Sequence, residues 1–592
     1  MARNKFDIDE TLETPFNFTQ LKRSAVYIKK HARVMVLALF LSALSTILLL
    51  CGPLLLQRAI DVSIPNKDMR EILLLAAALL VTIIGSIIFT TIRQRLMAKV
   101  GQDIIYDIRS DLFTHLQELS FNYYDSRPHG KILVRVVQYV NSVSDMLSNG
   151  IINFVLELFN LVFITLFMFL ASPRLSVIIL AGLPIFATVM MFVAPIQRRA
   201  WQSFSNKNSN LNAYASESIN GIKVTQIFNR EVQNKKNFMG LCRQSKKRWM
   251  SAIYSSNVTW CAAEIIGQSI FCAIYIVGVL YTFPSVTIGA LASMASYSWR
   301  FWQPINNLSQ IYNNFVNTIA YLERIFETID EPVEIQNVPN AATLPPIQGA
   351  VTFDNVVFGY DEQTTVLGGV SFEVKPGESI ALVGPTGAGK TTIVNLISRF
   401  YNVTEGRVLI DGQDISQVTL HSLRSQMGIM LQDSFIFAGP IIDNIRYGKL
   451  DATLEEVRAA CKAVNADGFI EEMPEGYDTI MSEGGSSLSQ GQKQLVSFAR
   501  TLIADPKILI LDEATSAIDT KTELLVQRGL QTLLKGRTSF IIAHRLSTIK
   551  SCDRIMYVNG GTITECGSHS ELMARKGDYY RLYTAQIEDQ AV

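Results

Sequence analysis

Long apolar stretches alternate with polar segments over the first half of the chain. Six of them stand out, at residues 34–56, 72–92, 151–171, 175–196, 258–281 and 285–305. A helix needs about 20 apolar residues to cross the hydrocarbon of a bilayer, and each stretch is close to that length. Six such runs are hard to explain as buried helices of a soluble protein. They predict six membrane-spanning helices, the last least clearly because it contains Arg300.

The two long polar segments, 93–150 and 197–257, keep apolar residues at helical spacing, as in the run from Ile104 to Leu116. We expect them to extend the membrane helices into the cytosol. Bends are expected near 125–130 and near 220–221, where Gly, Pro and Asn interrupt the pattern. Such bends can form short transverse helices that contact a cytoplasmic domain.

Charge orients this membrane half. The segment 197–257 has two acidic residues, Glu217 and Glu231, and eleven basic ones: Arg198, Arg199, Lys207, Lys223, Arg230, Lys235, Lys236, Arg243, Lys246, Lys247 and Arg248. Cytoplasmic loops carry such an excess of Lys and Arg. The pattern predicts a multi-pass protein of the cell (plasma) membrane, with both long segments and both termini in the cytoplasm.

Composition agrees with a membrane protein. The chain has 592 residues, of which 48% are hydrophobic and only 18% charged. A net charge of +1 gives no reason to expect a nucleic-acid partner. The seven cysteines are scattered and odd in number, which favours a reduced setting over a disulfide framework. We see no cleavable signal peptide.

A change of pattern marks a second half. Four prolines fall within residues 329–348, where the helical spacing stops, and this stretch is expected to be a linker. Short strand-like runs follow at 351–353, 356–360 and 370–374, as in an α/β domain. The predicted organisation is a transmembrane domain at 1–328, the linker, and a nucleotide-binding domain at 349–592.

Residues 384–391 read Gly-Pro-Thr-Gly-Ala-Gly-Lys-Thr, a match to the phosphate-binding P-loop. An apolar run at 379–383 predicts the strand before it, and 391–397 the helix after it. The glycines let backbone N–H groups close around phosphate oxygens at a helix N-terminus. We expect Lys390 to reach the β- and γ-phosphates of ATP and Thr391 to hold Mg²⁺. The expected phosphate-binding residues are Gly384, Pro385, Thr386, Gly387, Ala388, Gly389, Lys390, Thr391 and Thr392.

A second acidic motif follows further along the chain. Residues 508–511 are apolar and predict a buried strand, with Asp512 at its carboxyl end, where ligands of such sheets bind. Asp512 can hold Mg²⁺, and Glu513 can polarise the water that attacks the γ-phosphate. The two motifs in one α/β domain indicate nucleotide hydrolysis.

Between these motifs lies Leu488-Ser489-Gln490-Gly491-Gln492. Here the chain resembles the ATP-binding cassette (ABC) transporters, whose signature is usually L-S-G-G-Q, and the resemblance covers nearly the whole chain. Six spans followed by one cassette resemble a multidrug or lipid exporter half-transporter, in particular the competent subunit of heterodimeric bacterial exporters. The resemblance implies that Tyr360 stacks on adenine, that residues 516–519 form the D-loop, and that Ser489, Gly491 and Gln492 bind nucleotide. The implied catalytic residues are Glu513 and His544, and the implied Mg²⁺ ligands are Thr391, Gln432 and Asp512.

The resemblance also implies a dimer. In the family, the signature helix of a partner closes each P-loop site, and hydrolysis lets the two cassettes part. One cassette and one set of spans therefore call for a second half-transporter. Gln490 replaces the usual glycine, at a cost either in close phosphate approach or in backbone freedom. With Glu513 kept, this favours a heterodimer, and a homodimer is the alternative.

These features predict ATP-driven export of amphipathic small molecules across a lipid membrane. A lipid flippase is the alternative within transport. An ATP-gated regulatory ABC protein is disfavoured by Glu513 and His544, and a soluble P-loop enzyme with unrelated anchors by the signature. An importer is disfavoured because its membrane and ATPase parts are usually separate chains.

Three charged residues fall inside or at the edge of the predicted spans: Glu157, Glu264 and Arg300. A charge at the centre of a spanning helix costs at least about 2.5–3.5 kcal/mol, so such residues usually face a cavity or one another. Two hypotheses follow. The three residues line a polar cavity that receives substrate, or they form a structural ion pair.

Overall fold

The computed structural model describes residues 18–591 except 126, 128, 281–285, 361–363, 431–433, 514–519 and 544–545, and except some side chains within helices and strands. The chain forms two compact units, Met1–Gln117 with Pro128–Glu331, and Glu118–Arg127 with Pro332–Val592. The first unit is helical, and the second is α/β, as predicted. Each is described by itself.

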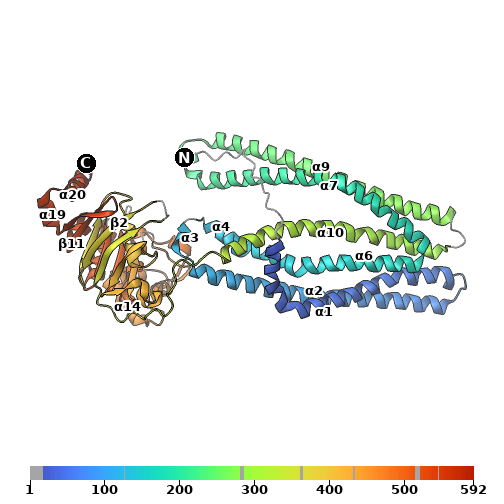
Figure 1. Ribbon diagram of the computed structural model, residues 1–592, viewed down its shortest axis with the longest axis horizontal. Helices are drawn as coiled ribbons and strands as arrows, with labels where there is room; N and C mark the ends of the chain where they lie inside the picture. The colour runs from blue at the N-terminus through green and yellow to red at the C-terminus, as the bar shows by residue number, and fades with distance from the viewer. Residues whose placement is uncertain are drawn as a thin grey trace. The chain divides into compact units, whose positions relative to one another are not determined.

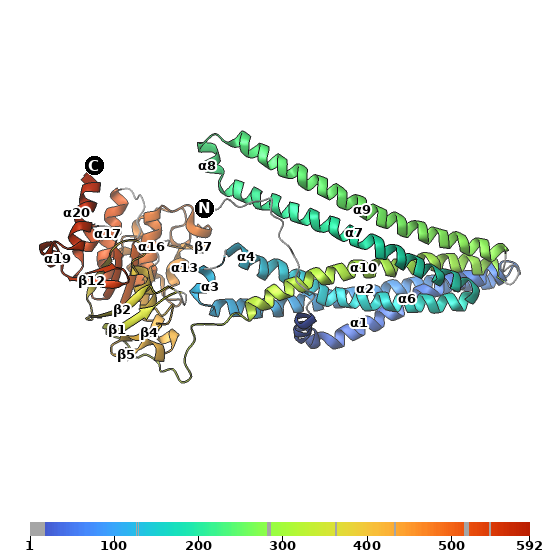
Figure 2. The same cartoon turned by 45° about the horizontal axis from the view of Figure 1, so that its top comes forward.

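The helical unit consists of long helices joined by short connections. Its elements are α1 (Phe18–Arg58), η1 (Ala59–Ser63), α2 (Met69–Glu118), α4 (His129–Val134), η2 (Arg135–Tyr139), α5 (Val140–Asp145), η3 (Met146–Gly150), α6 (Ile151–Ala171), α7 (Pro173–Asn220), α8 (Ile222–Ile227), α9 (Glu231–Leu280) and α10 (Ile288–Ile329). Helix α10 packs along α1 and α6, and α7 packs along α9 (Figure 1). The expected bend at residues 220–221 is confirmed, since α7 ends there and the short helix α8 follows (Figure 2).

Five helical segments of the described chain are long and apolar enough to cross a membrane: Leu21–Ser63, Met69–Glu118, Ile132–Ala171, Pro173–Asn220 and Glu231–Leu280. They contain the first five predicted stretches, apart from residue 281, which lies outside the described residues. The sixth stretch falls largely in α10, which does not meet the same criterion, because Arg300 and several Ser, Asn and Gln residues interrupt its apolar positions. A sixth span therefore stays a prediction.

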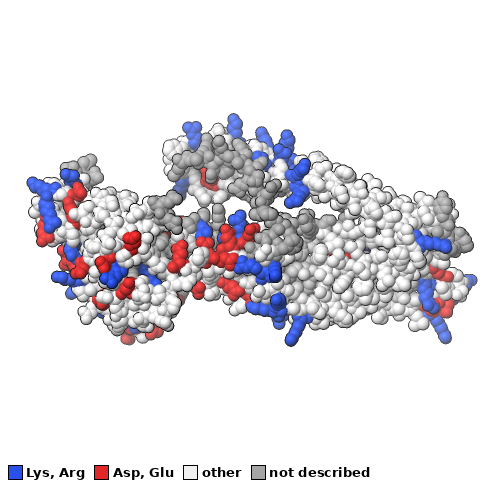
Figure 3. Space-filling view, viewed as in Figure 1, with Lys and Arg blue, Asp and Glu red and all other residues white. Residues whose placement is uncertain are grey.

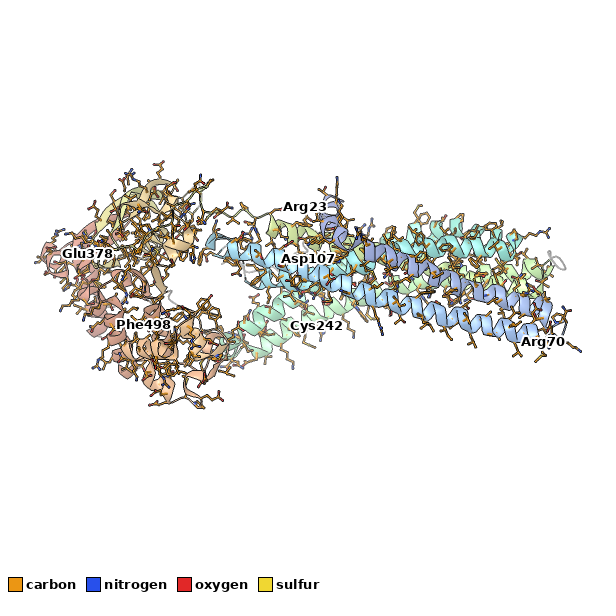
Figure 4. All side chains as sticks on the ribbon, turned by 90° about the horizontal axis from the view of Figure 1, so that it is seen from below. Arg23, Arg70, Asp107, Cys242, Glu378 and Phe498 are labelled. Atoms are coloured by element: carbon orange, nitrogen blue, oxygen red, sulfur yellow. The ribbon has the colours of Figure 1, made fainter. Side chains whose placement is uncertain are left out.

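Charged side chains gather toward the ends of the helical unit and leave a nearly uncharged zone between them (Figure 3). Arg70 lies near one end, and Arg23 and Asp107 lie along the other half of the helices (Figure 4).

Arg23 near the start of α1 forms a bidentate ion pair with Asp330 after α10, at 2.5 and 2.7 Å. At the opposite end of these helices, the Asp61 carboxylate accepts hydrogen bonds from Thr287 and from the Gly289 amide. Side-chain contacts thus join one end of α10 to α1 and the other end to η1, which follows α1.

The α/β unit contains one mainly parallel sheet and two small antiparallel ones. Its strands are β1 (Val351–Phe358), β2 (Leu367–Val374), β3 (Ser379–Val383), β4 (Glu405–Ile410), β5 (Gln413–Asp414), β6 (Met427–Met430), β7 (Gly439–Pro440), β8 (Ile480–Met481), β9 (Ile508–Glu513), β10 (Thr538–Ala543), β11 (Arg554–Asn559) and β12 (Thr562–Gly567). The six-stranded sheet has the order β12-β11-β3-β10-β9-β6, and the four-stranded sheet β2-β1-β4-β5. Strand β3 is central and buried, which explains its unbroken apolar sequence.

Helices cover these sheets. They are α3 (Phe121–Asp125), α11 (Lys390–Ile397), η4 (Ile415–Gln417), α12 (Leu420–Arg424), α13 (Ile441–Arg446), α14 (Leu454–Ala463), α15 (Asp467–Glu471), η5 (Gly476–Asp478), η6 (Glu483–Gly485), α16 (Gln490–Ile503), α17 (Thr520–Leu534), α18 (Leu546–Ser551), α19 (His569–Arg575) and α20 (Asp578–Ala591). One apolar cluster includes side chains of α11, and a second includes side chains of α16. The P-loop helix and the signature helix thus belong to different cores of this unit.

One strand expectation was wrong. The runs 351–353 and 356–360 are not two strands, because β1 continues from Val351 to Phe358. A register shift against β2 lies between Phe353 and Val356, and Asn355 has φ +47°. The two polar residues between the expected runs, Asp354 and Asn355, form a bulge inside one strand.

Candidate nucleotide site

The P-loop follows the predicted strand–loop–helix order, from β3 to α11. Gly384, Gly387 and Gly389 have φ of +142°, +81° and +106°, a region that L-residues rarely adopt. A Cβ on Gly384 would lie 2.1 Å from the Val558 carbonyl oxygen, and one on Gly389 would lie 2.7 Å from Leu367 Cδ2. The loop therefore depends on glycine both for its backbone conformation and for its close packing against β11 and β2.

We expect the two glycines Gly384 and Gly387 to respond differently to alanine. Gly387 has open space within 4 Å of a Cβ, so Gly387→Ala should cost only backbone strain of about 1 kcal/mol. Gly384→Ala adds a steric clash with β11 and should cost about 1–3 kcal/mol more. Thermal unfolding of the purified variants measures the difference. Equal melting temperatures would show that the loop does not have this geometry.

Lys390 points back into the loop. It is 9% exposed, and its Nζ donates to the carbonyl oxygens of Gly384 and Pro385 at 2.9 and 2.8 Å. Burial lowers the pKa of Lys390, while the nearby Asp512 carboxylate acts in the opposite direction. The ammonium group is held at the mouth of the glycine cradle, where an incoming phosphate oxygen is a better acceptor than a carbonyl.

The residue types around the loop suit a nucleoside triphosphate. The cradle of backbone amides starts α11, and the Thr391 side chain beside Lys390 is exposed. Thr392 is buried, and its Oγ1 lies 3.1 Å from the Tyr360 hydroxyl. The Tyr360 ring is 43% exposed and so leaves a face open to a planar base.

Strand β9 brings the acidic motif to the same edge of the sheet. In the strand order, β10 lies between β3 and β9, and all three run parallel. Asp512 therefore ends β9 on the edge where β3 leads into the P-loop, in agreement with its electrostatic effect on Lys390. The backbone of Glu513 pairs with Ala543, the last residue of β10. The Glu513 side chain, His544, Gln432 and residues 516–519 lie outside what the structure describes.

The signature residues begin α16. The Ser489 Oγ accepts a hydrogen bond from the backbone N–H of Gln492. The side-chain oxygen of Gln492 accepts one from the backbone N–H of Ser489, and the two bonds form a capping box. Gln490 is the first residue of the helix, and its backbone φ is not positive. The usual glycine is therefore not required here for backbone conformation. What Gln490 changes is the size of the side chain at the helix N-terminus.

A contact that the sequence did not predict joins the aromatic residues of the site to α3. The Tyr401 ring lies edge-on to Tyr360 at 5.1 Å, and its hydroxyl donates to the Asp125 carboxylate at 3.2 Å. Burial and Asp125 both raise the pKa of Tyr401. Beside it, the Phe121 and Phe400 rings lie 4.2 Å apart. The only sequence signal is the aromatic pair 400–401 after the P-loop helix, which does not name its partners.

Two family models match this chain. Residues 35–305 match the ABC transporter transmembrane region, and residues 367–516 match the ABC transporter domain. The chain is 41% identical, over 99% of its length and 98% of the relative's, to the uncharacterized ABC transporter ATP-binding protein YknV of Bacillus subtilis (strain 168). The chain belongs to the ABC transporters. More specifically, its similarities are to ABC exporter half-transporters.

Other relatives of this ABC transporter carry more specific names. A fatty acid ABC transporter ATP-binding/permease protein of Mycobacterium tuberculosis (strain CDC 1551 / Oshkosh) is 36% identical over 83% of this chain and 78% of the relative. An ATP-dependent lipid A-core flippase of Desulfotalea psychrophila (strain LSv54 / DSM 12343) is 34% identical over 83% and 86%. A solved bacterial Atm1-family ABC exporter with ATP bound superposes with a TM-score of 0.77, at 30% identity over 96% of this chain and 99% of the other.

These similarities confirm the predicted architecture, a helical membrane domain fused to a P-loop ABC ATPase domain. The ABC transporter is a multi-pass membrane protein whose cassette binds and hydrolyses ATP and couples hydrolysis to export. ABC exporters function as dimers in the membrane.

The three charges of the membrane spans do not pair with one another among the described contacts. Glu157 accepts hydrogen bonds from Asn160 and Asn307, Glu264 accepts one from Gln268, and Arg300 donates to the Leu49 carbonyl. A cavity of 460 Å³ on α9 is lined by Glu264, Ile265, Gln268, Ser269 and Cys272. The ion-pair hypothesis is therefore wrong for these three residues as the structure describes them.

Proposed function

We propose that this ABC exporter moves amphipathic small molecules from the cytoplasm across the cell membrane, as one half of a dimer. The observation that carries the proposal is a phosphate-binding site in one chain with long apolar helices: the glycine cradle, Lys390, and Asp512 on the same edge of the sheet. The names of the fatty acid transporter and the lipid A-core flippase support an amphipathic substrate.

The proposed roles at the site follow from position and chemistry. Lys390 binds the β- and γ-phosphates, and Tyr360 stacks on adenine. Thr391, Asp512 and Gln432 would hold Mg²⁺, which neutralises charge on the phosphates. Glu513 orients and polarises the attacking water, and His544 contacts the γ-phosphate. We propose the functional division 1–328, 329–348 and 349–592, with the second unit in the cytoplasm because the basic segment 197–257 marks that side.

Tyr401 is expected to support the adenine site through its ring. Tyr401→Ala removes the edge-to-face contact with Tyr360 and should weaken ATP binding about 2- to 10-fold. Tyr401→Phe keeps the ring and loses only the hydroxyl that reaches Asp125, so it should bind ATP like the parent. Titration with a fluorescent ATP analogue compares the two. Equal weakening in both variants would assign the effect to the hydroxyl and contradict this role.

Exposed apolar surfaces support a dimer. The short helix α8 exposes Ile222, Val224 and Ile227 at the tip of the α7–α9 pair. In the other unit, Phe437 and Tyr447 stack at 4.8 Å and are both exposed. Such patches on a single chain are typical of surfaces that a partner covers.

We favour a heterodimer because of Gln490. At the first position of α16 its side chain stands where the family's signature helix approaches the partner's γ-phosphate, so the site that this helix closes should mainly hold nucleotide. The site built on Lys390 and Glu513 should hydrolyse it. Gln490→Gly should then raise ATPase activity only modestly, since the partner's own catalytic residue would also be altered.

The test is affinity purification from the native membrane, followed by reconstitution into vesicles. We expect a second half-transporter in one-to-one ratio, and ATPase activity that a panel of amphipathic compounds stimulates. A chain that alone forms a dimer with full stimulated ATPase activity would make Gln490 a neutral variant and the exporter a homodimer. Stimulation by membrane lipids, with none by soluble amphiphiles, would favour the lipid flippase, the second candidate that a relative's name supports.

A further inference from the structure

Glu157 joins three helices of the membrane unit through uncharged groups. Its two carboxylate oxygens accept hydrogen bonds from Asn307 Nδ2 on α10 at 2.7 Å and from Asn160 Nδ2 on α6 at 3.0 Å. Thr46 on α1 in turn donates to Asn160 Oδ1 at 3.0 Å. The carboxylate therefore sits at a junction of α1, α6 and α10, and it is only half-buried.

The hydrogen bonds of Asn160 fix which of its side-chain groups faces Glu157. The Thr46 hydroxyl engages the oxygen of the Asn160 amide, so its NH₂ group is the one that faces Glu157. Both oxygens of Glu157 then accept N–H groups of neutral amides.

Two basic side chains of the membrane helices, Arg93 and Arg300, donate to groups other than Glu157. Arg93 on α2 donates to Asn153 Oδ1 at 3.4 Å, one turn before Glu157. Arg300 donates to the Leu49 carbonyl at 3.3 Å, and it lies two turns along α10 from Asn307, about 10 Å away. No ion pair to Glu157 is found among the side chains that the structure describes. A carboxylate in a membrane helix whose described partners are all neutral can pair with a cationic group of a ligand.

Aromatic rings line the same α6–α10 contact. Phe154 on α6 lies one turn from Glu157, with its ring 6.2 Å from Phe315 of α10 and 41% of its side chain exposed. A carboxylate next to aromatic rings is the combination that recognises organic cations, through charge attraction and cation–π contact.

We propose that Glu157 and the neighbouring aromatic rings bind a positively charged group of the transported amphiphile. The inference rests on the proposed export function and adds the charge class of its substrate. The carboxylate attracts a cationic head while the rings hold its apolar part, and an anionic amphiphile meets like charge at the same point. Glu157 is thus a residue that determines substrate specificity.

The test compares three probes of similar shape in vesicles that contain the complete purified exporter: tetraphenylphosphonium (cation), triphenylphosphine oxide (neutral) and tetraphenylborate (anion). ATPase stimulation gives a half-maximal concentration for each. Glu157→Gln keeps the shape of the side chain and should raise this concentration for tetraphenylphosphonium at least about tenfold. The value for the neutral probe should change less than about twofold.

Two matched variants separate charge from structure. Glu157→Asp keeps the charge and should retain most of the preference for the cation. Glu217→Gln removes a negative charge at an exposed position of α7, outside the predicted spans, and should leave the preference unchanged. Equal shifts for all three probes in Glu157→Gln, or loss of cation preference in Glu217→Gln, would overturn the assignment.

A second measurement needs no variant. Dicyclohexylcarbodiimide labels carboxyl groups in apolar surroundings, and mass spectrometry follows the labelling of Glu157 and Glu264 in the parent protein. Tetraphenylphosphonium should protect Glu157, and tetraphenylborate should not. Lack of protection contradicts the proposal even if Glu157→Gln fails to fold. No stimulation of the parent by any of the three probes would count instead against amphiphile export itself.

Discussion

Glu513→Gln is expected to leave ATP binding intact and to slow hydrolysis by at least about 100-fold. The amide keeps the size of the side chain but cannot accept a proton from the attacking water. The backbone of residue 513 lies at the carboxyl end of β9, paired with the last residue of β10, on the edge of the sheet that leads into the P-loop. Phosphate release measures the rate, and titration with a fluorescent ATP analogue measures binding.

The matched control for this variant is Glu405→Gln, which makes the same chemical change at an exposed position of β4. It should hydrolyse ATP like the parent. If Glu513→Gln turned over ATP at the parent rate, Glu513 would not be the catalytic carboxylate. If Glu513→Gln lost nucleotide binding as well, its role would be structural.

Lys390→Ala is expected to act one step earlier and weaken ATP binding about 10- to 100-fold. The lysine is the charged donor at the mouth of the cradle, and its two carbonyl acceptors belong to the loop itself. Its removal would take away the charge-assisted hydrogen bonds that we propose to the phosphates, and also the hydrogen bonds to the Gly384 and Pro385 carbonyls. Equilibrium titration with the fluorescent analogue measures the loss.

Lys462→Ala serves as the control, because Lys462 is exposed on α14 and lies outside the P-loop. It should bind ATP with the parent affinity. Unchanged affinity in Lys390→Ala would mean that the phosphates bind elsewhere. The two main variants together separate the steps, since Glu513→Gln retains bound ATP and Lys390→Ala does not.

Short-range features of this exporter could be predicted from the sequence. The P-loop is fixed by the spacing of its glycines and by the apolar strand before it, and the structure has β3, the loop and α11 in that order. The break at Gly221 was likewise visible, because glycine after asparagine ends a helix. In each case the physical cause lies within a few residues of its effect.

Long-range contacts could not be predicted in this way. Tyr401 reaches Asp125 across a separation of 276 residues, and Glu157 meets Asn307 across 150. The sequence marked Glu157 as costly in a membrane span, and tertiary packing then supplied its neutral partners. The prediction of two separate strands at 351–353 and 356–360 failed for a different reason. The Asp-Asn pair between them favours a turn locally, but hydrogen bonding to β2 and β4 keeps β1 a single strand.

We expect ATP hydrolysis at this chain's own site to drive export, and uptake into inside-out vesicles tests this most directly. Vesicles with the parent exporter and any co-purifying partner should accumulate an amphipathic fluorescent substrate when ATP is added, and should not do so with a non-hydrolysable analogue. Vesicles with Glu513→Gln should bind ATP and accumulate nothing above background. Undiminished ATP-dependent accumulation by the Glu513→Gln exporter would contradict the account.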